Sequence, residues 1–167
     1  MRSEFPAHLR APEAPRRFRL HPYQWVGIPL MFLVPVLALL GVFGETWERA
    51  EALGGGLALE VRYADRYRYK QINTVEAWVE NRTGTRLDTV VVAFDEAYVR
   101  EFSTLMFVPA ATEAFEVELY DVAPGERRLV WAEFQAERYG RHEGALRAYV
   151  PGAPDTASVV LSTLVFP

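Results

Sequence analysis

The chain has 167 residues, of which 50% are hydrophobic, with a formal net charge of −4 and no cysteine. The lack of cysteine excludes disulfides, thiolate nucleophiles and cysteine-ligated metal sites. Residues 1–44 carry five basic and two acidic side chains, whereas residues 45–167 carry thirteen basic and twenty acidic ones. An acidic domain lacks the basic face that neutralises phosphates, so we expect no nucleic acid among its partners.

Residues 22–44 form an apolar stretch without a single charged side chain. A helix of this length, rising about 1.5 Å per residue, spans the roughly 30 Å hydrocarbon core of a bilayer. We therefore predict a single transmembrane helix at 22–44, kept in the mature chain as an anchor. A cleaved signal peptide is the alternative, but its apolar core usually has only about 7–15 residues. Pro29 and Pro35 predict a kink, because each removes a helical hydrogen-bond donor.

The residues before this helix indicate its orientation. Residues 1–21 contain five arginines and three prolines without an apolar period, which is typical of a disordered basic tail. Arginines next to a span stay in the cytoplasm. We therefore expect a single-pass protein of the cytoplasmic (inner) membrane, with a cytoplasmic tail at 1–21 and a periplasmic or other extracytoplasmic domain. The residues expected at the membrane interfaces are Arg16, Arg17, Arg19, Tyr23, Trp25 and Trp47.

The segment after the apolar stretch contains helix-forming residues and then three glycines. Thr46–Leu53 is rich in Glu and Ala, and Gly54–Gly56 follows it directly. We predict a short helical extension and a flexible glycine hinge over 45–56.

From residue 57 the hydrophobic pattern changes to a period of two, which indicates strands. Turns are expected at 81–85 and 120–126, where Asn, Gly, Asp and Pro gather. The connection at 95–111 predicts a short helix and an edge strand. Together these patterns predict a mainly β domain over 57–167, an antiparallel immunoglobulin-like β-sandwich of 7–8 strands. The expected strands are 57–63, 72–81, 87–94, 112–119, 128–136, 144–150 and 157–166.

Two short motifs carry a resemblance to a known group of domains. Asn81-Arg-Thr-Gly84 joins two strands, and Val122-Ala-Pro-Gly-Glu126 leads into another. With these motifs, residues 57–166 resemble bacterial membrane-anchored extracytoplasmic immunoglobulin-like domains of the adhesion and accessory kind. The resemblance implies the β-sandwich fold, and it implies far less about function.

The residues that carry chemistry are sparse beyond the apolar stretch. His142 is the single histidine there, and Met106 the single methionine. Copper and zinc sites need several such ligands together. Ser103 lacks the surroundings of a nucleophile elbow. We predict no metal, no cofactor and no enzymatic activity.

Three features suggest surfaces for a partner. In the stretch 62–70, an extended backbone would place the arginines on one side and the tyrosines on the other. The segment 95–111 is unusually apolar, and either meets a partner or fills the core. On their strands, Trp78 and Trp131 fall opposite the residues expected to point inward. The candidate contact residues are Arg62, Arg66, Tyr67, Arg68, Tyr69, Trp78, Tyr98, Phe102, Met106, Phe107 and Trp131.

The sequence thus favours an interaction protein. We expect a non-enzymatic, membrane-anchored accessory or scaffold subunit that contacts other integral membrane or envelope proteins. The alternative is an extracytoplasmic glycan- or ligand-binding module that uses the Arg/Tyr-rich segment 62–70.

Overall fold

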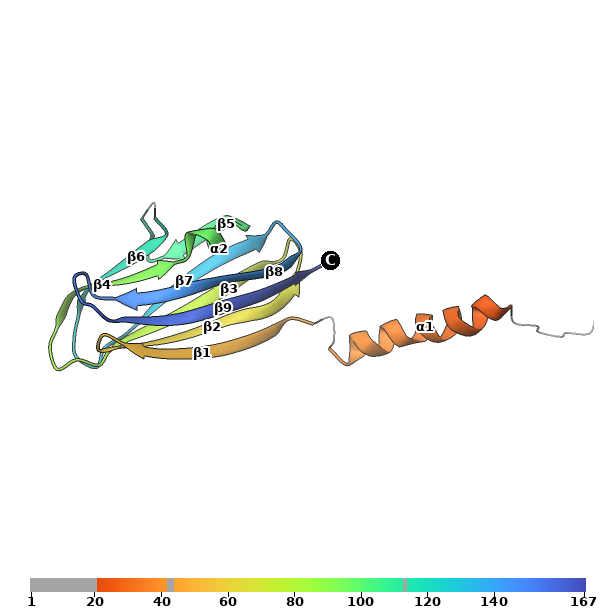
Figure 1. Ribbon diagram of the computed structural model, residues 1–167, viewed down its shortest axis with the longest axis horizontal. Helices are drawn as coiled ribbons and strands as arrows, with labels where there is room; N and C mark the ends of the chain where they lie inside the picture. Colours follow the sequence, from red (N-terminus) through yellow and green to blue (C-terminus); the bar gives the residue numbers. More distant parts are fainter. Residues whose placement is uncertain (1–20, 42–43, 113) are drawn as a thin grey trace, which may run out of the picture. The chain divides into compact units, whose positions relative to one another are not determined.

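Figure 1 shows the computed structural model, which describes residues 21–41, 44–112 and 114–167. The basic tail predicted at 1–21 lies outside the described residues, apart from His21, and so do Arg16, Arg17 and Arg19. The chain divides into two compact units, Met1–Leu40 and Gly41–Pro167.

The described part of the first unit is one helix, α1 (Pro22–Leu39). It begins after the N-cap His21 with a proline at its first turn, a position that needs no backbone donor. The helix continues through Pro29 and Pro35, and none of its residues is buried. By length and composition α1 is able to cross a membrane or to act as a signal sequence. The predicted apolar helix is therefore confirmed, although it ends five residues before the predicted boundary at 44.

The second unit is mainly β, as predicted. Its described residues form nine strands in one sheet, with the order β5-β7-β3-β2-β9-β8-β4-β6 and with β1 paired to β2. A short helix, α2 (Glu96–Val99), precedes β5. The strands are β1 (Thr46–Gly54), β2 (Leu57–Arg68), β3 (Ile72–Asn81), β4 (Leu87–Phe94), β5 (Phe102–Val108), β6 (Glu116–Val122), β7 (Arg127–Ala136), β8 (Gly140–Tyr149) and β9 (Thr156–Phe166).

The sheet curls into a half-barrel around the core. Phe94 of β4 and Phe134 of β7 have ring centroids 6.0 Å apart, although four strands separate β4 from β7 in the sheet. We expected the two separate sheets of an immunoglobulin-like sandwich, and that finer description is not confirmed. The strands form one continuous sheet because β2 is long enough to pair with two neighbours. Its first half pairs with β3, and its end, Arg66–Arg68, pairs in parallel with β9.

The helical extension and glycine hinge predicted at 45–56 are wrong. Residues 46–54 form β1, which runs antiparallel to β2 from Thr46 opposite Arg66 to Gly54 opposite Leu57. Ala50 and Ala52 pack partly buried against the core, so pairing and burial outweigh the helix propensity of this segment. The β unit thus includes residues 46–54 and does not begin at residue 57.

The three glycines form a close-packed turn between β1 and β2. Gly55 and Gly56 have φ angles of 58° and 73°, which favour glycine. A Cβ on Gly54 would lie 2.4 Å from the carbonyl oxygen of Thr156. The backbone of Thr156 thus leaves no room for a side chain at Gly54, because the turn lies directly beside the start of β9.

Most other boundaries follow the sequence pattern. β3 and β4 have the predicted bounds, and the segment 95–111 contains α2 and β5 as expected. The turn after β3 is built on Asn81, which is fully buried. Its amide nitrogen donates to the carbonyl oxygens of Thr85 (2.9 Å) and Val122 (3.0 Å). One side chain thereby joins two turns at the same end of the sheet.

Candidate functional site

The outer surface of β3 and β7 presents two tryptophans. Inward residues of both strands are buried, including Ala77 and Ala132 with no exposed area, so their neighbours face outward. Glu76 pairs with Trp131 and Trp78 pairs with Leu129. Trp78 and Trp131 therefore lie diagonally on neighbouring strands of the outer surface. The prediction that both point away from the core is confirmed.

The strand registers extend this surface across five strands. One row of directly paired outward residues runs from Arg49 through Arg62, Glu76 and Trp131 to Val108. The neighbouring row contains Glu51, Glu60, Trp78 and Leu129. We call this surface the tryptophan face; its members are Trp47, Arg49, Glu51, Glu60, Arg62, Glu76, Trp78, Met106, Val108, Arg127, Leu129 and Trp131.

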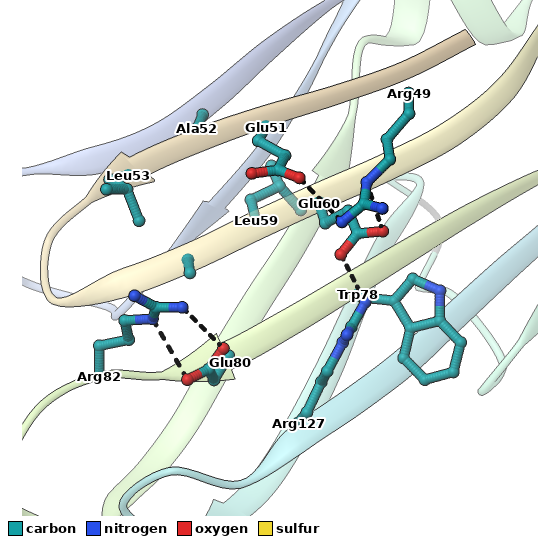
Figure 2. A pocket seen from close by; sticks show the side chains of 11 residues that line it. Arg49, Glu51, Ala52, Leu53, Leu59, Glu60, Trp78, Glu80, Arg82 and Arg127 are labelled. Carbon is teal, nitrogen blue, oxygen red and sulfur yellow. Dashed lines mark hydrogen bonds and ion pairs between the residues drawn. The ribbon is translucent and has the colours of Figure 1, made fainter.

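Glu60 lies at the centre of a charged network on this face (Figure 2). Its carboxylate accepts from Arg127 Nη2 at 2.6 Å and lies 2.9 Å from Arg49 Nε. Arg49 also contacts Glu51 at 2.9 Å. The guanidinium of Arg127 lies 4.6 Å from the ring centroid of Trp78. The indole and the carboxylate together hold Arg127 in place, since cation–π and ionic contacts act on the same group.

A second arginine–tryptophan pair lies on β1 and β2. The guanidinium of Arg62 is 5.4 Å from the ring of Trp47, whose side chain is 44% exposed. Two open grooves, of about 570 and 450 Å³, follow this surface and share Arg49, Glu60, Trp78 and Arg127. These residue types suit binding, because flat aromatic and guanidinium groups offer large contact areas and directed donors.

The Arg/Tyr segment is two-sided as predicted, but its tyrosines do not form a contact surface. Tyr67 is only 3% exposed, and its burial raises the pKa of its hydroxyl. Tyr69 is half-buried and its ring centroid lies 4.5 Å from that of Tyr139. Arg62 and Arg68 are exposed, and Arg66 is half-buried. The prediction of Tyr67 as a contact residue is wrong, because the inward side of β2 faces the core.

The segment 95–111 mainly fills the core. Tyr98 and Phe102 are 3% and 6% exposed, and their ring centroids lie 4.9 Å apart. Phe107 points inward and contacts Phe94 edge-on at 5.2 Å. Met106 alone among the four predicted contact residues of this segment is exposed, at 47%. The prediction of Tyr98 and Phe102 as partner contacts is wrong, because both fill the core as the alternative expected. Phe107 packs against the core but is only partly buried.

Tyr98 also carries a buried polar contact. Its hydroxyl lies 2.9 Å from Thr163 Oγ1, and burial raises the pKa of Tyr98 to about 12. The hydroxyl is thus kept in its neutral form inside the core.

The predicted interface residues fall on different elements. Tyr23 and Trp25 are exposed on α1, at 81% and 69%. Trp47 lies on β1 and belongs to the tryptophan face. Sequence reasoning missed Arg49, Glu60 and Arg127. The alternation of inward and outward residues could have placed Glu60 and Arg127 on the outer surface of their strands. A single sequence does not show the strand register that brings these two residues together.

The residues that the sequence offered for chemistry contact different groups in the described part of the chain. Within residues 21–41, 44–112 and 114–167, no group of three or more His, Cys, Asp or Glu side chains is able to hold a metal. The hydroxyl of Ser103 donates to Glu137. His142 contacts the carbonyl oxygen of Arg138 at 3.1 Å through Nε2. Ser103 and His142 thus have separate hydrogen-bond partners.

Comparisons with known proteins add a likeness of architecture. No family model matches the sequence, and no curated protein matches it. Among solved structures, the chain is similar to the CARDB domain of a protein from Pyrococcus furiosus, solved in complex with di-metal ions. The TM-score is 0.47 with 9% sequence identity, over 69% of this chain and 94% of that one. This distant similarity concerns the β fold and carries nothing about function.

Proposed function

We propose that this protein is a non-enzymatic, membrane-anchored accessory or scaffold subunit that docks onto other integral membrane or envelope proteins. In this proposal α1 is a retained anchor in the cytoplasmic membrane, the N-terminus is cytoplasmic and the β unit is periplasmic. The β unit acts as an immunoglobulin-like module, supported by the facing of Phe94 and Phe134 across its core.

The tryptophan face is the observation that carries this proposal. All three tryptophans of the β unit lie on it, together with three arginines. Tryptophan and arginine are the residue types that dominate binding energy at protein interfaces. Exposed apolar side chains border them, with Met106 at 47% and Val108 at 40% exposure. A surface with this composition is suited to a protein partner.

The charge network supports docking rather than opposing it. Glu60 is paired with Arg49 and Arg127 before any partner arrives. A partner that covers this surface therefore buries paired charges, which costs less than burying isolated ones. The side chains are also held in place by their contacts, which lowers the entropy cost of association.

A ligand-binding module is the second candidate, and a specific observation favours it. The groove of about 450 Å³ brings Trp47, Arg62 and Trp78 together on the outer surface, where a sugar ring has aromatic surfaces to stack on. This version uses Arg62 without the buried Tyr67.

Site-specific photo-crosslinking in native membranes tests the docking proposal. A photoreactive amino acid replaces Trp131 on the tryptophan face or, as a control, Val160 of β9, which is 69% exposed. We expect the probe at 131 to form an adduct with one membrane or envelope protein, identified by mass spectrometry, and the probe at 160 to form none. Equal labelling at both positions, or a full-length chain that stays alone in mild detergent, contradicts the proposal.

Shortening one side chain of the tryptophan face tests how much that side chain contributes to docking. Trp78→Ala should reduce the yield of the 131 adduct, because it removes the support of Arg127 and a direct contact. The melting temperature of the β unit serves as the folding control. If the adduct yield is unchanged and glycan binding is lost in the same variant, the second candidate replaces the first.

A further inference from the structure

The chain enters the β unit at one end of the sheet, which we call the tyrosine end because Tyr69 and Tyr139 lie there. β1, β3 and β8 begin at this end, and β2, β7 and β9 finish there. Glu45, which directly precedes β1, accepts a hydrogen bond from Gln71 Nε2 at 2.7 Å. The entry point of the chain therefore lies beside the turn between β2 and β3.

Exposed aromatic and apolar side chains lie at the same end. Ile72 and Tyr139 are 54% and 57% exposed. The ring centroid of Tyr69 lies 4.5 Å from that of Tyr139, and the guanidinium of Arg68 lies 6.0 Å from the ring of Phe166. Tyrosine rings and the apolar stems of basic side chains are the groups that proteins place at the level of lipid headgroups.

Basic side chains at this end are free to move at the surface. Arg68, Lys70, Arg138 and Arg141 are all exposed. Lys70 and Arg138 have carboxylate partners at the surface, but such exposed ion pairs contribute little stability. Both side chains are therefore able to turn toward a lipid phosphate at small cost.

The net charge of the β unit lies mainly outside the tyrosine end. The segments at this end carry six basic and seven acidic side chains, whereas the rest of 45–167 carries seven basic and thirteen acidic ones. Anionic lipids repel the acidic remainder more strongly than the nearly neutral end. The charge distribution thus turns the tyrosine end toward an anionic surface. Its segments are 45–48, 65–74, 96–103, 134–143 and 162–167.

We propose that the tyrosine end rests on the lipid bilayer, with Ile72 and Tyr139 at the level of the headgroups. The inference rests on the proposed function, because it needs α1 to span the membrane. Residues 40–45 join α1 to β1, and six residues reach at most about 22 Å. A spanning α1 therefore keeps the entry point of the β unit close to the bilayer.

This short tether favours the bilayer as the occupant of the tyrosine end. A short linker gives an effective concentration of the order of mM, so a few side chains are sufficient for contact with a surface that is always near. The contact is also compatible with the proposed docking. Trp78 and Trp131 lie several residues along their strands from Ile72 and its partner Gln135, so they stay open to a protein partner.

Spin labels in the full-length chain test this contact, because the chain has no cysteine of its own. Ile72→Cys and Tyr139→Cys carry a nitroxide in vesicles of phosphatidylethanolamine and phosphatidylglycerol. Depth is measured as the ratio of collision rates with oxygen, which concentrates in lipid, and with a nickel chelate, which stays in water. We expect a severalfold higher ratio at 72 and 139 than in Leu53→Cys, a control at the opposite end that is 73% exposed.

A second variant tests whether apolar side chains hold the contact. Ile72→Asp in the Tyr139→Cys chain should lower the ratio at 139 to the value at 53, because a carboxylate is repelled by the lipid phosphates. Leu53→Asp is the matched control and should leave the ratio at 139 unchanged. Melting curves establish that both variants fold. An unchanged ratio at 139 in the Ile72→Asp chain contradicts the inference.

Two further labels separate this inference from the proposed function. Phe32→Cys reports on α1, and Met106→Cys reports on the tryptophan face. If the label at 32 lies in hydrocarbon while the labels at 72 and 139 match the label at 53, the inference is wrong and the anchor stands. If the label at 32 is in water, both are wrong. Insertion at 106 in place of 72 and 139 would assign the bilayer to the tryptophan face and overturn the inference.

Discussion

The two ends of the β unit are held together by different kinds of contact. At the glycine-turn end, where β1 meets β2 and β3 meets β4, buried hydrogen bonds from Asn81 and the close contact of Gly54 with Thr156 fix the turns. At the tyrosine end, where β2, β7 and β9 finish, the interior contains Tyr67, Tyr98 and Thr163.

The contrast lies in the chemistry of these contacts. Asn81 has an amide that does not titrate, and it bonds to Thr85 and Val122. Tyr98 has a hydroxyl that titrates, and it contacts Thr163 inside the core. We therefore expect the glycine-turn end to respond to single polar or steric changes, and the tyrosine end to respond to pH.

Asn81→Ala should have the largest effect. The variant leaves the carbonyl oxygen of the buried Val122 without this donor, which costs about 1–3 kcal/mol, and it also removes the hydrogen bonds that Asn81 makes with Thr83 and Thr85. We expect a loss of about 3 kcal/mol in the free energy of unfolding, measured by urea denaturation of the full chain in mild detergent. Arg82→Ala is the control, because its ion pair with Glu80 is exposed; equal losses in the two variants would contradict the assignment.

Gly54→Ala should have the next largest effect. Its Cβ would lie 2.4 Å from the carbonyl oxygen of Thr156, whereas a Cβ on Gly84 would meet no atom within 4 Å. Overpacking of this kind costs about 1–3 kcal/mol, so Gly54→Ala should lower the melting temperature and Gly84→Ala should not. If both variants melt like the parent chain, the three glycines form a loose linker and not a packed turn.

The alkaline limb of the stability profile should report on the tyrosine end. Because burial raises the pKa of Tyr98 to about 12, the folded state keeps this proton after the unfolded state loses it near pH 10. Stability from this group is complete below about pH 10 and falls by about 1.4 kcal/mol per pH unit up to about pH 12. Tyr98→Phe should make this slope shallower.

Asn81→Ala is the reference for that experiment, because it alters the other end of the sheet. It should lower stability at every pH without changing the alkaline slope. A slope that is identical in the parent chain and in Tyr98→Phe would show that Tyr98 is not the titrating group.

Lys70→Met should have the smallest effect. The carboxylate of Glu137 raises the pKa of Lys70, but the pair is exposed and 2.5 Å long, and such pairs contribute little. We expect no measurable change in melting temperature at physiological salt. A clear decrease would mean that surface ion pairs also stabilise the tyrosine end.

The sequence predicted the regular strands well for a physical reason. In β3, buried residues such as Val75 and Val79 alternate with less buried ones, so the outward position of Trp78 could be inferred. In β4, an apolar run with three consecutive buried valines lies between polar residues, and this run indicated the strand bounds. β1 could not be recognised in the same way. Its inward residues, Ala50 and Ala52, favour helices over strands, and its conformation depends on pairing with β2.

The candidate site was only partly predictable. Alternation placed Trp78 and Trp131 outward, but the network around Glu60 joins residues from three strands. Arg127 contacts Glu60 across 67 positions of the chain, and a single sequence does not reveal that register. For Tyr98 and Phe102 the apolar sequence was compatible both with a place in the core and with a contact surface. The structure buries both side chains in the core.

The parallel pairing of β2 with β9 has a consequence for biosynthesis. The hydroxyl of Thr163 donates to the carbonyl of Ala64, 99 positions earlier, and Arg66 pairs with Leu164. The hairpins β1–β2 and β2–β3 join residues close in the chain, so they are able to form early. The pairing of the end of β2 requires β9, which is synthesised much later. A nascent chain therefore carries an incomplete sheet until β9 has been synthesised. During this interval the unpaired strand edges are exposed, and we expect chaperones to bind the chain then.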